Sequence, residues 1–156
     1  MKKRATRRLA ALALALAACA PPPALDANPD VKAGVEQLLQ RWAANGEQGD
    51  WDALKTLYAD DPAFSWVEQG RIAYPDYASV VAGVGKTAAL KPQIATRLDN
   101  VAVTPLGVAT AAFRADVDMT FKSDSVGFEF DGVITGVAVW RDNRWQFLQA
   151  HLSSPN

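Results

Sequence analysis

The spacing of apolar side chains changes near residue 93, and this change most constrains what the chain can fold into. Before it, apolar residues recur at the three- and four-residue spacing of an amphipathic helix, as over residues 31–42. After it, they alternate with polar residues, most clearly over residues 113–121. Residues 126–140 are largely apolar on both faces, which is typical of a central strand. Helices followed by long antiparallel strands predict an α+β domain in which helices cover one face of a curved sheet.

Three helical segments are expected in the first half of the chain. Residues 31–44 predict the first helix, and Asn45–Gly46 is expected to end it. Asp50 is a suitable N-cap for a short second helix, because its carboxylate can accept a hydrogen bond from the first turn. Residues 63–67 predict a short strand, and Pro75–Asp76 begins a third helical stretch. We therefore expect about three helices over the sheet.

The N-terminal residues are typical of a bacterial export signal. Residues 1–18 hold five of the 16 basic side chains and none of the 17 acidic ones. Their apolar run is too short to span a bilayer, which needs about 20 residues, and it ends in Leu16–Ala17–Ala18–Cys19. This ending resembles the lipobox of bacterial lipoproteins, and the resemblance implies cleavage before Cys19 and acylation of that cysteine. An ordinary cleaved signal peptide is the alternative.

A proline-rich segment follows the cysteine over residues 20–30 and predicts an extended spacer. We therefore expect a signal peptide at 1–18, a lipidated cysteine and spacer at 19–30, and one domain at 31–154, tethered to a membrane of the cell envelope. Ala20 follows the cysteine, which resembles lipoproteins of the outer membrane that face the periplasm. Beyond the signal the chain has 11 basic and 17 acidic side chains, so nucleic acid is not an expected partner.

The C-terminal residues 137–153 carry a family resemblance. They contain a turn at Asp142–Asn143, then Trp145, and a strand that ends in His151–Leu152–Ser153. This pattern resembles the end of SnoaL-like domains, which belong to the superfamily of nuclear transport factor 2 and ketosteroid isomerase. Residues 49–64 are similar to the second helix and following strand of these domains. The resemblance implies a cone-shaped half barrel with a pocket at its open end, and a homodimer.

Because this superfamily includes isomerases, cyclases, dehydratases, ligand binders and dimerisation modules, the site must decide the function. Strand alternation within the implied cone gives the candidate pocket residues. These are Tyr58, Trp66, Tyr74, Arg97, Arg114, Asp116, Asp118, Phe128 and His151. The aromatic members favour a small apolar or amphipathic ligand.

Three of these residues are candidate acids or bases. His151 is the single histidine, and imidazole titrates near neutrality; a buried structural histidine is the alternative. Asp116 and Asp118 share a face with Arg114, and either carboxylate could act as a base in a pocket; a solvated outer face is the alternative. The first helix lacks the tyrosine that ketosteroid isomerases place there, so Tyr58 would take that role only if it projects into the pocket.

Other kinds of site are excluded by composition and spacing. Residues 83–87 (Gly-Val-Gly-Lys-Thr) lack the first glycine and the preceding strand of a phosphate-binding loop. One histidine and no unmodified cysteine do not make a typical zinc site, so we expect no metal and no cofactor. The leading interpretation is a tethered domain that binds a small molecule. The alternatives are a cofactor-independent enzyme for proton transfer, such as an isomerase, dehydratase or hydrolase, and a dimeric interaction subunit.

Overall fold

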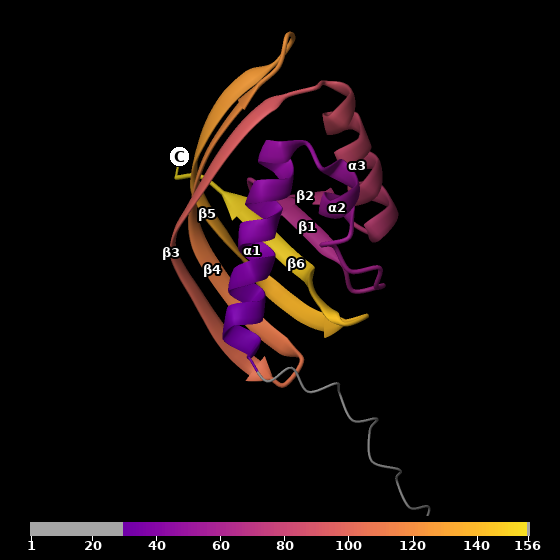
Figure 1. The fold of residues 1–156 in the computed structure, drawn as a ribbon, viewed down its shortest axis with the longest axis vertical. Helices are drawn as coiled ribbons and strands as arrows, with labels where there is room; N and C mark the ends of the chain where they lie inside the picture. The colour runs from indigo at the N-terminus through magenta and orange to yellow at the C-terminus, as the bar shows by residue number, and fades with distance from the viewer. Residues whose placement is uncertain (1–29, 156) are drawn as a thin grey trace, which may run out of the picture.

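The computed structural model describes residues 30–155, in which helices pack on one face of a curved sheet (Figure 1). The predicted signal peptide, Cys19 and the spacer up to residue 29 lie outside this range. Within it, no helix combines the length and the apolar character that a membrane span requires.

Helices dominate the first half of the described chain, and strands make up the second. In chain order the elements are α1 (Val31–Gln48), α2 (Trp51–Lys55), β1 (Ser65–Glu68), β2 (Arg71–Tyr74), α3 (Tyr77–Ala89), β3 (Gln93–Gly107), β4 (Thr110–Lys122), β5 (Gly127–Arg141) and β6 (Arg144–Ser153). This order confirms the predicted α+β class and the three helices. The short strand β2 adds to the strands expected from the sequence.

The strands of the described chain form one sheet in the order β2-β1-β6-β5-β4-β3. Neighbouring strands run antiparallel except β1 and β6, which are parallel. The expected antiparallel pairing therefore holds for every pair but this one. The long strands β3, β4 and β5 curve around α1, so that the inner face of the sheet is turned toward the helices (Figure 1).

Aspartate side chains fix the starts of the described helices. Asp30, Asp50 and Asp76 each accept a hydrogen bond from the backbone N–H three residues further on. Each bond satisfies a donor that the first helical turn would otherwise leave free. The end of α1 differs from the expectation, because Gly46 lies inside the helix. The helix instead ends at Gly49, whose φ of 69° is a left-handed conformation that favours glycine.

The hydrophobic core lies between α1 and the inner face of the sheet. Val35, Leu38 and Leu39 point from α1 toward the strands and are almost completely buried. Phe64, before β1, and Phe147, on β6, fill the space on the sheet side. Because apolar burial is the main favourable contribution to folding, these contacts hold the helices on the sheet. The same layer of helices forms the wall of the site described next.

Candidate functional site

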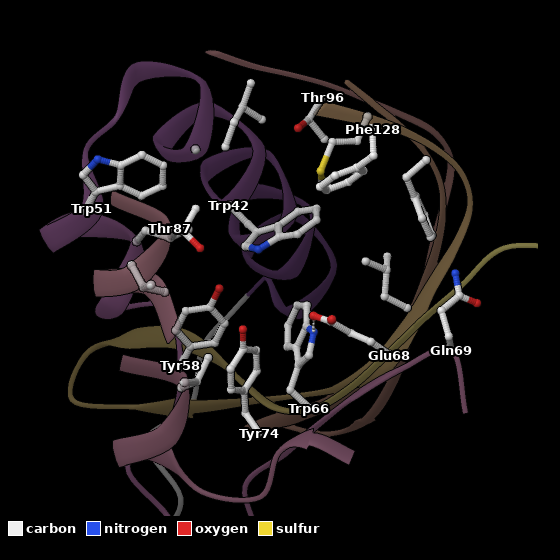
Figure 2. A pocket seen from close by; sticks show the side chains of 18 residues that line it. Trp42, Trp51, Tyr58, Trp66, Glu68, Gln69, Tyr74, Thr87, Thr96 and Phe128 are labelled. Carbon is white, nitrogen blue, oxygen red and sulfur yellow. Dashed lines mark hydrogen bonds between the residues drawn. The ribbon is translucent and has the colours of Figure 1, made fainter. Parts of the chain in front are cut away.

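A cavity of about 260 Å³ opens between the helices and the inner face of the sheet (Figure 2). Its aromatic lining consists of Trp42, Trp51, Tyr58, Trp66, Tyr74, Phe128 and Phe130. Its aliphatic and sulfur-containing side chains are Leu54, Val80, Val84, Ile94, Met119 and Leu152, and its polar ones are Glu68, Gln69, Thr87 and Thr96. The volume lies just below the roughly 300–1,000 Å³ typical of pockets for drug-sized ligands, so the site suits a small metabolite.

Aromatic rings make one end of this cavity rigid. Tyr58 meets Trp66 edge-on with ring centroids 5.6 Å apart, and Trp42 lies 6.1 Å from Trp66. Behind them, the ring of Phe147 contacts both Tyr58 and Trp66 and is fully buried. Edge-to-face packing of this kind favours particular ring orientations. The wall of the site is therefore formed before any ligand enters.

Three polar side chains of the cavity lie together at this aromatic end. In Figure 2 the hydroxyls of Tyr58 and Tyr74 and the carboxylate of Glu68 point toward the same space. Trp66 Nε1 donates a hydrogen bond to Glu68 Oε1 at 2.9 Å, which orients the carboxylate. Glu68 is the one charged side chain among the residues that line the cavity. The site thus combines an apolar body with a small polar end that holds a single negative charge.

Both phenols in the cavity stay protonated at physiological pH. Burial raises the pKa of Tyr58 well above the ordinary tyrosine value of 10.0, and a hydrogen bond with the Trp42 indole opposes part of that effect. Burial also raises the pKa of Tyr74, and the negative charge of Glu68 adds to the increase. Each hydroxyl can therefore both donate and accept a hydrogen bond.

Gly83 on α3 makes room for Tyr74. A Cβ atom at position 83 would lie 2.5 Å from Tyr74 Cε1 and 2.7 Å from the Tyr74 hydroxyl oxygen, which is too close for either group to stay in place. Gly85, two residues further on, has nothing within 4 Å of the corresponding position. Gly83 therefore serves the packing of Tyr74 against the helix rather than a phosphate-binding loop.

The structure brings together four of the nine candidate pocket residues. Tyr58, Trp66, Tyr74 and Phe128 line the cavity. The other five, Arg97, Arg114, Asp116, Asp118 and His151, lie on the opposite, outer face of the sheet.

On the outer face these side chains contact one another or solvent rather than the cavity. Arg97 donates a hydrogen bond from Nη2 to Asp118 Oδ2 at 2.9 Å and forms an ion pair with Asp99 at 3.1 Å. Asn100 Nδ2 donates to Asp116 Oδ2 at 2.6 Å. The arrangement corresponds to the alternative of a solvated face, because the apolar side of β4 is the side that the helices cover.

His151 reaches the outer face because β6 contains a bulge. Phe147 pairs with Ala138, but Gln149 pairs with Val137, so Leu148 is an extra residue on β6. A one-residue insertion reverses the alternation of a strand beyond it. Uninterrupted alternation predicts that Phe147 and His151 share a face, and this prediction is wrong: Phe147 is fully buried, whereas His151 is exposed.

Sequence reasoning missed Glu68, Trp42 and Thr87. A signal for Glu68 is present, because it stands two residues after Trp66 and alternation places both on one face of β1. The sequence predicts a strand that ends at Val67, one residue too early to include Glu68. Trp42 belongs to the apolar stripe of the first helix, which predicts burial but does not distinguish a core residue from a cavity wall.

Comparison with known proteins assigns the chain to a family. The profile of the SnoaL-like domain family matches residues 35–156. The chain belongs to the SnoaL-like family. This membership confirms the resemblance to SnoaL-like domains carried by residues 137–153 and 49–64.

Solved structures share the fold of this SnoaL-like domain at low identity. A candidate dehydratase of the nuclear transport factor 2-like family from Streptomyces avermitilis is 20% identical, with a TM-score of 0.71 over 83% of this chain and 99% of that chain. A superfamily protein from Salmonella enterica is 16% identical, with a TM-score of 0.67 over 78% and 89% of the two chains. A candidate scytalone dehydratase from Novosphingobium aromaticivorans is 14% identical, with a TM-score of 0.65 over 80% and 83%. No curated protein matches the chain. At these identities the likeness shows the fold alone.

The chemistry open to this SnoaL-like domain follows from its polar end. Glu68 is a carboxylate that can accept hydrogen bonds or a proton, and the two phenols can donate hydrogen bonds to an oxygen of a ligand. Within residues 30–155, no group of three or more His, Cys, Asp or Glu side chains gathers closely enough to hold a metal ion.

Proposed function

We propose that this SnoaL-like domain binds a small, largely apolar molecule in the cavity of Figure 2. The observation that supports it is the cavity itself: about 260 Å³, walled by aromatic and aliphatic side chains, with Glu68, Tyr58 and Tyr74 grouped at one end. An apolar wall with a few convergent polar groups is the usual form of a small-molecule site. The wall supplies affinity through apolar burial, and the polar end fixes orientation.

Native mass spectrometry of the protein purified from a bacterial host tests this proposal. We expect a reproducible additional mass that is lost on denaturation. Thr87→Trp, which places a large ring at the cavity wall, should abolish it, because the added indole occupies the ligand's space. Thr120→Trp is the matched control, since Thr120 is exposed on β4 and lies outside the cavity. A ligand retained by a folded Thr87→Trp variant, or no ligand in the unaltered protein, would contradict the proposal.

A second candidate function is cofactor-independent proton transfer in the same cavity. It is supported by the position of Glu68 beside two protonated phenols. In such a reaction Glu68 takes a proton from a carbon next to a substrate carbonyl, and the phenols donate hydrogen bonds to the oxygen that becomes negative. His151, Asp116 and Asp118 take no part in this version, because they lie on the outer face. Once a ligand is known, Glu68→Gln should abolish its turnover, while burial against the apolar wall should still give measurable binding.

We also propose that the domain works while lipid-anchored through Cys19, at the outer membrane and facing the periplasm. The support is the lipobox-like ending of the N-terminal apolar run and the proline-rich spacer after it. A Cys19→Ser variant expressed in a diderm host should move from the outer-membrane fraction to the soluble fraction or keep its signal peptide. An unchanged fractionation would contradict the anchor.

The homodimer implied by the family is a further proposal, and its interface would be the outer face of the sheet. Arg114 lies on this face, exposed and opposite Thr135 of β5. If two copies pack face to face, Arg114→Glu should shift the mass measured by light scattering from dimer to monomer without changing the cavity. A monomer before the substitution would contradict the proposal.

A further inference from the structure

The cavity carries a negative charge that no neighbouring cation neutralises. Glu68 is its one charged lining residue, and Lys, Arg and His are absent from the lining. Among the described residues, none of the ion pairs includes Glu68, and its hydrogen-bond partner is Trp66. Arg71 lies opposite Glu68 across the β1–β2 pair but neither lines the cavity nor forms an ion pair with it. A ligand with a carboxylate or phosphate would therefore meet repulsion at the polar end.

The hydrogen-bonding groups at this end are better matched to a donor than to an acceptor. Trp66 Nε1 already donates its hydrogen bond to Glu68. Three groups remain for a ligand: the second oxygen of Glu68, which only accepts, and the hydroxyls of Tyr58 and Tyr74, each of which can accept as well as donate. A head group with several N–H donors can use all three.

The surrounding rings also favour a positive charge. Trp42, Tyr58, Trp66 and Tyr74 lie around the space in front of Glu68 (Figure 2). The π-systems of Trp and Tyr attract cations near their faces, and aromatic-lined sites with a nearby carboxylate recognise organic ammonium groups for this reason. An alkylated ammonium also loses less hydration than a metal ion when it enters such a site.

We propose that the ligand of this cavity is an organic amine in its protonated form, with the ammonium group against Glu68 and an apolar body along Met119 and Phe130. This inference rests on the proposed small-molecule binding and specifies the class of ligand. The cavity volume limits the body to roughly the size of one aromatic ring with a short chain.

Three probes of similar shape test the charge preference by isothermal titration calorimetry at pH 7. They are 3-phenylpropylammonium, 3-phenylpropan-1-ol and 3-phenylpropanoate, which place a cation, a neutral hydroxyl and an anion on one body. We expect the cation to bind about tenfold more tightly than the alcohol, because it gains the attraction of the unpaired carboxylate, and the anion to show no binding.

Glu68→Gln should remove this preference, so that cation and alcohol bind with affinities within about twofold of each other. Glutamine keeps an oxygen that can accept from Trp66 Nε1, so the ring position is retained. Glu129→Gln is the matched control: it removes one negative charge between Phe128 and Phe130 on an exposed site outside the cavity, and it should leave the preference unchanged.

The outcomes separate this inference from the proposal on which it rests. If the alcohol binds as tightly as the cation, or if the preference survives in Glu68→Gln, the amine ligand is wrong while small-molecule binding stands. If the anion binds most tightly, the assigned charge of the site is wrong. If none of the three probes binds at millimolar concentration, both the amine ligand and the proposed binding function are contradicted.

Discussion

The two faces of the sheet carry different kinds of polar side chain. The sequence draws attention to the ionisable residues of the outer face, but the cavity lies on the inner face. The outer face carries the conspicuous ionisable groups, including His151, Asp116 and Asp118, and there they pair locally or meet solvent. The inner face carries two tyrosines and one glutamate inside an aromatic cavity. Charged side chains are found mostly where water can hydrate them, and Glu68, the charged residue of the cavity, is itself exposed to solvent. Abundance of charge on a strand therefore indicates the solvent side rather than the site.

The largest expected effect of a single substitution is at Phe147 on the inner face. Its ring is fully buried and lies 5.5–6.0 Å from the rings of Phe113, Trp66 and Tyr58. Phe147→Ala should lower the free energy of unfolding by about 3–5 kcal/mol, since it removes this surface and leaves a void behind the cavity wall. Urea unfolding followed by circular dichroism measures the change.

Phe128→Ala is the matched control for Phe147→Ala. The Phe128 side chain is 49% exposed at the mouth of the cavity, and its main aromatic contact is a stacked pair with Phe121, centroids 5.0 Å apart. We expect a loss of about 0.5–1.5 kcal/mol. Equal losses at the two positions would contradict the account of Phe147 as the support of the cavity wall.

A second prediction concerns the two glycines of α3, where substitution by alanine should change the free energy of unfolding in opposite directions. Gly83→Ala should lower the free energy of unfolding by about 1–3 kcal/mol, because the new methyl group overlaps the ring of Tyr74. Gly85→Ala should raise it by about 0.5–1 kcal/mol, because alanine favours the helix and the site is open. Thermal and urea unfolding of both variants measure the difference. Two stabilised variants would show that Tyr74 does not press against Gly83.

The third prediction concerns stability at alkaline pH. Burial raises the pKa of Tyr58 and Tyr74 in the folded protein above the ordinary value of 10.0 that they have in the unfolded chain. The folded state therefore holds the phenol protons more tightly, and the stability due to them is complete below pH 10 and falls as the pH rises above 10. Urea unfolding between pH 8 and 11 measures this fall.

Tyr58→Phe is the control for this loss of stability at alkaline pH. Phenylalanine keeps most of the ring contacts with Trp66 and Phe147 but has no proton to release. The variant should therefore lose less stability between pH 9 and 11 than the unaltered protein. Identical pH profiles would mean that the Tyr58 hydroxyl does not stay protonated in the fold.

Much of the fold could be predicted because the residues that an element buries recur at the regular spacing of a helix or a strand. Residues 31–42 repeat at helical spacing because one side of α1 meets the sheet, and residues 113–121 alternate because one side of β4 meets the helices. The same pattern, together with the family resemblance, assigns Tyr58, Trp66 and Tyr74 to the pocket. Periodicity thus identifies elements and their faces.

The positions of the remaining site residues could not be predicted, because they depend on irregularities of the backbone and on contacts between elements that are distant in the sequence. Nothing in the side chains around Leu148 marks the bulge of β6, yet this bulge moves His151 to the outer face. A similar shift occurs in β3, where the pairing slips between Asp99 and Ala102 and Asn100 takes a φ of 50°. Alternation also separates two faces without saying which one a cavity will use.

The smallest expected effect is at His151, the residue that sequence alone makes the most attractive catalyst. Its side chain is exposed on the outer face, opposite Thr135 of β5 and Val67 of β1, and it does not line the cavity. His151→Ala should therefore change the free energy of unfolding by no more than about 0.5 kcal/mol, as exposed substitutions usually do. Binding of 3-phenylpropylammonium should be unchanged in affinity and in its pH dependence between 5.5 and 7.5, because the imidazole has no contact with the cavity. A pH dependence of binding that is lost in His151→Ala would instead show that the two faces are coupled. A lost affinity in a variant of normal stability would move the functional site to the outer face.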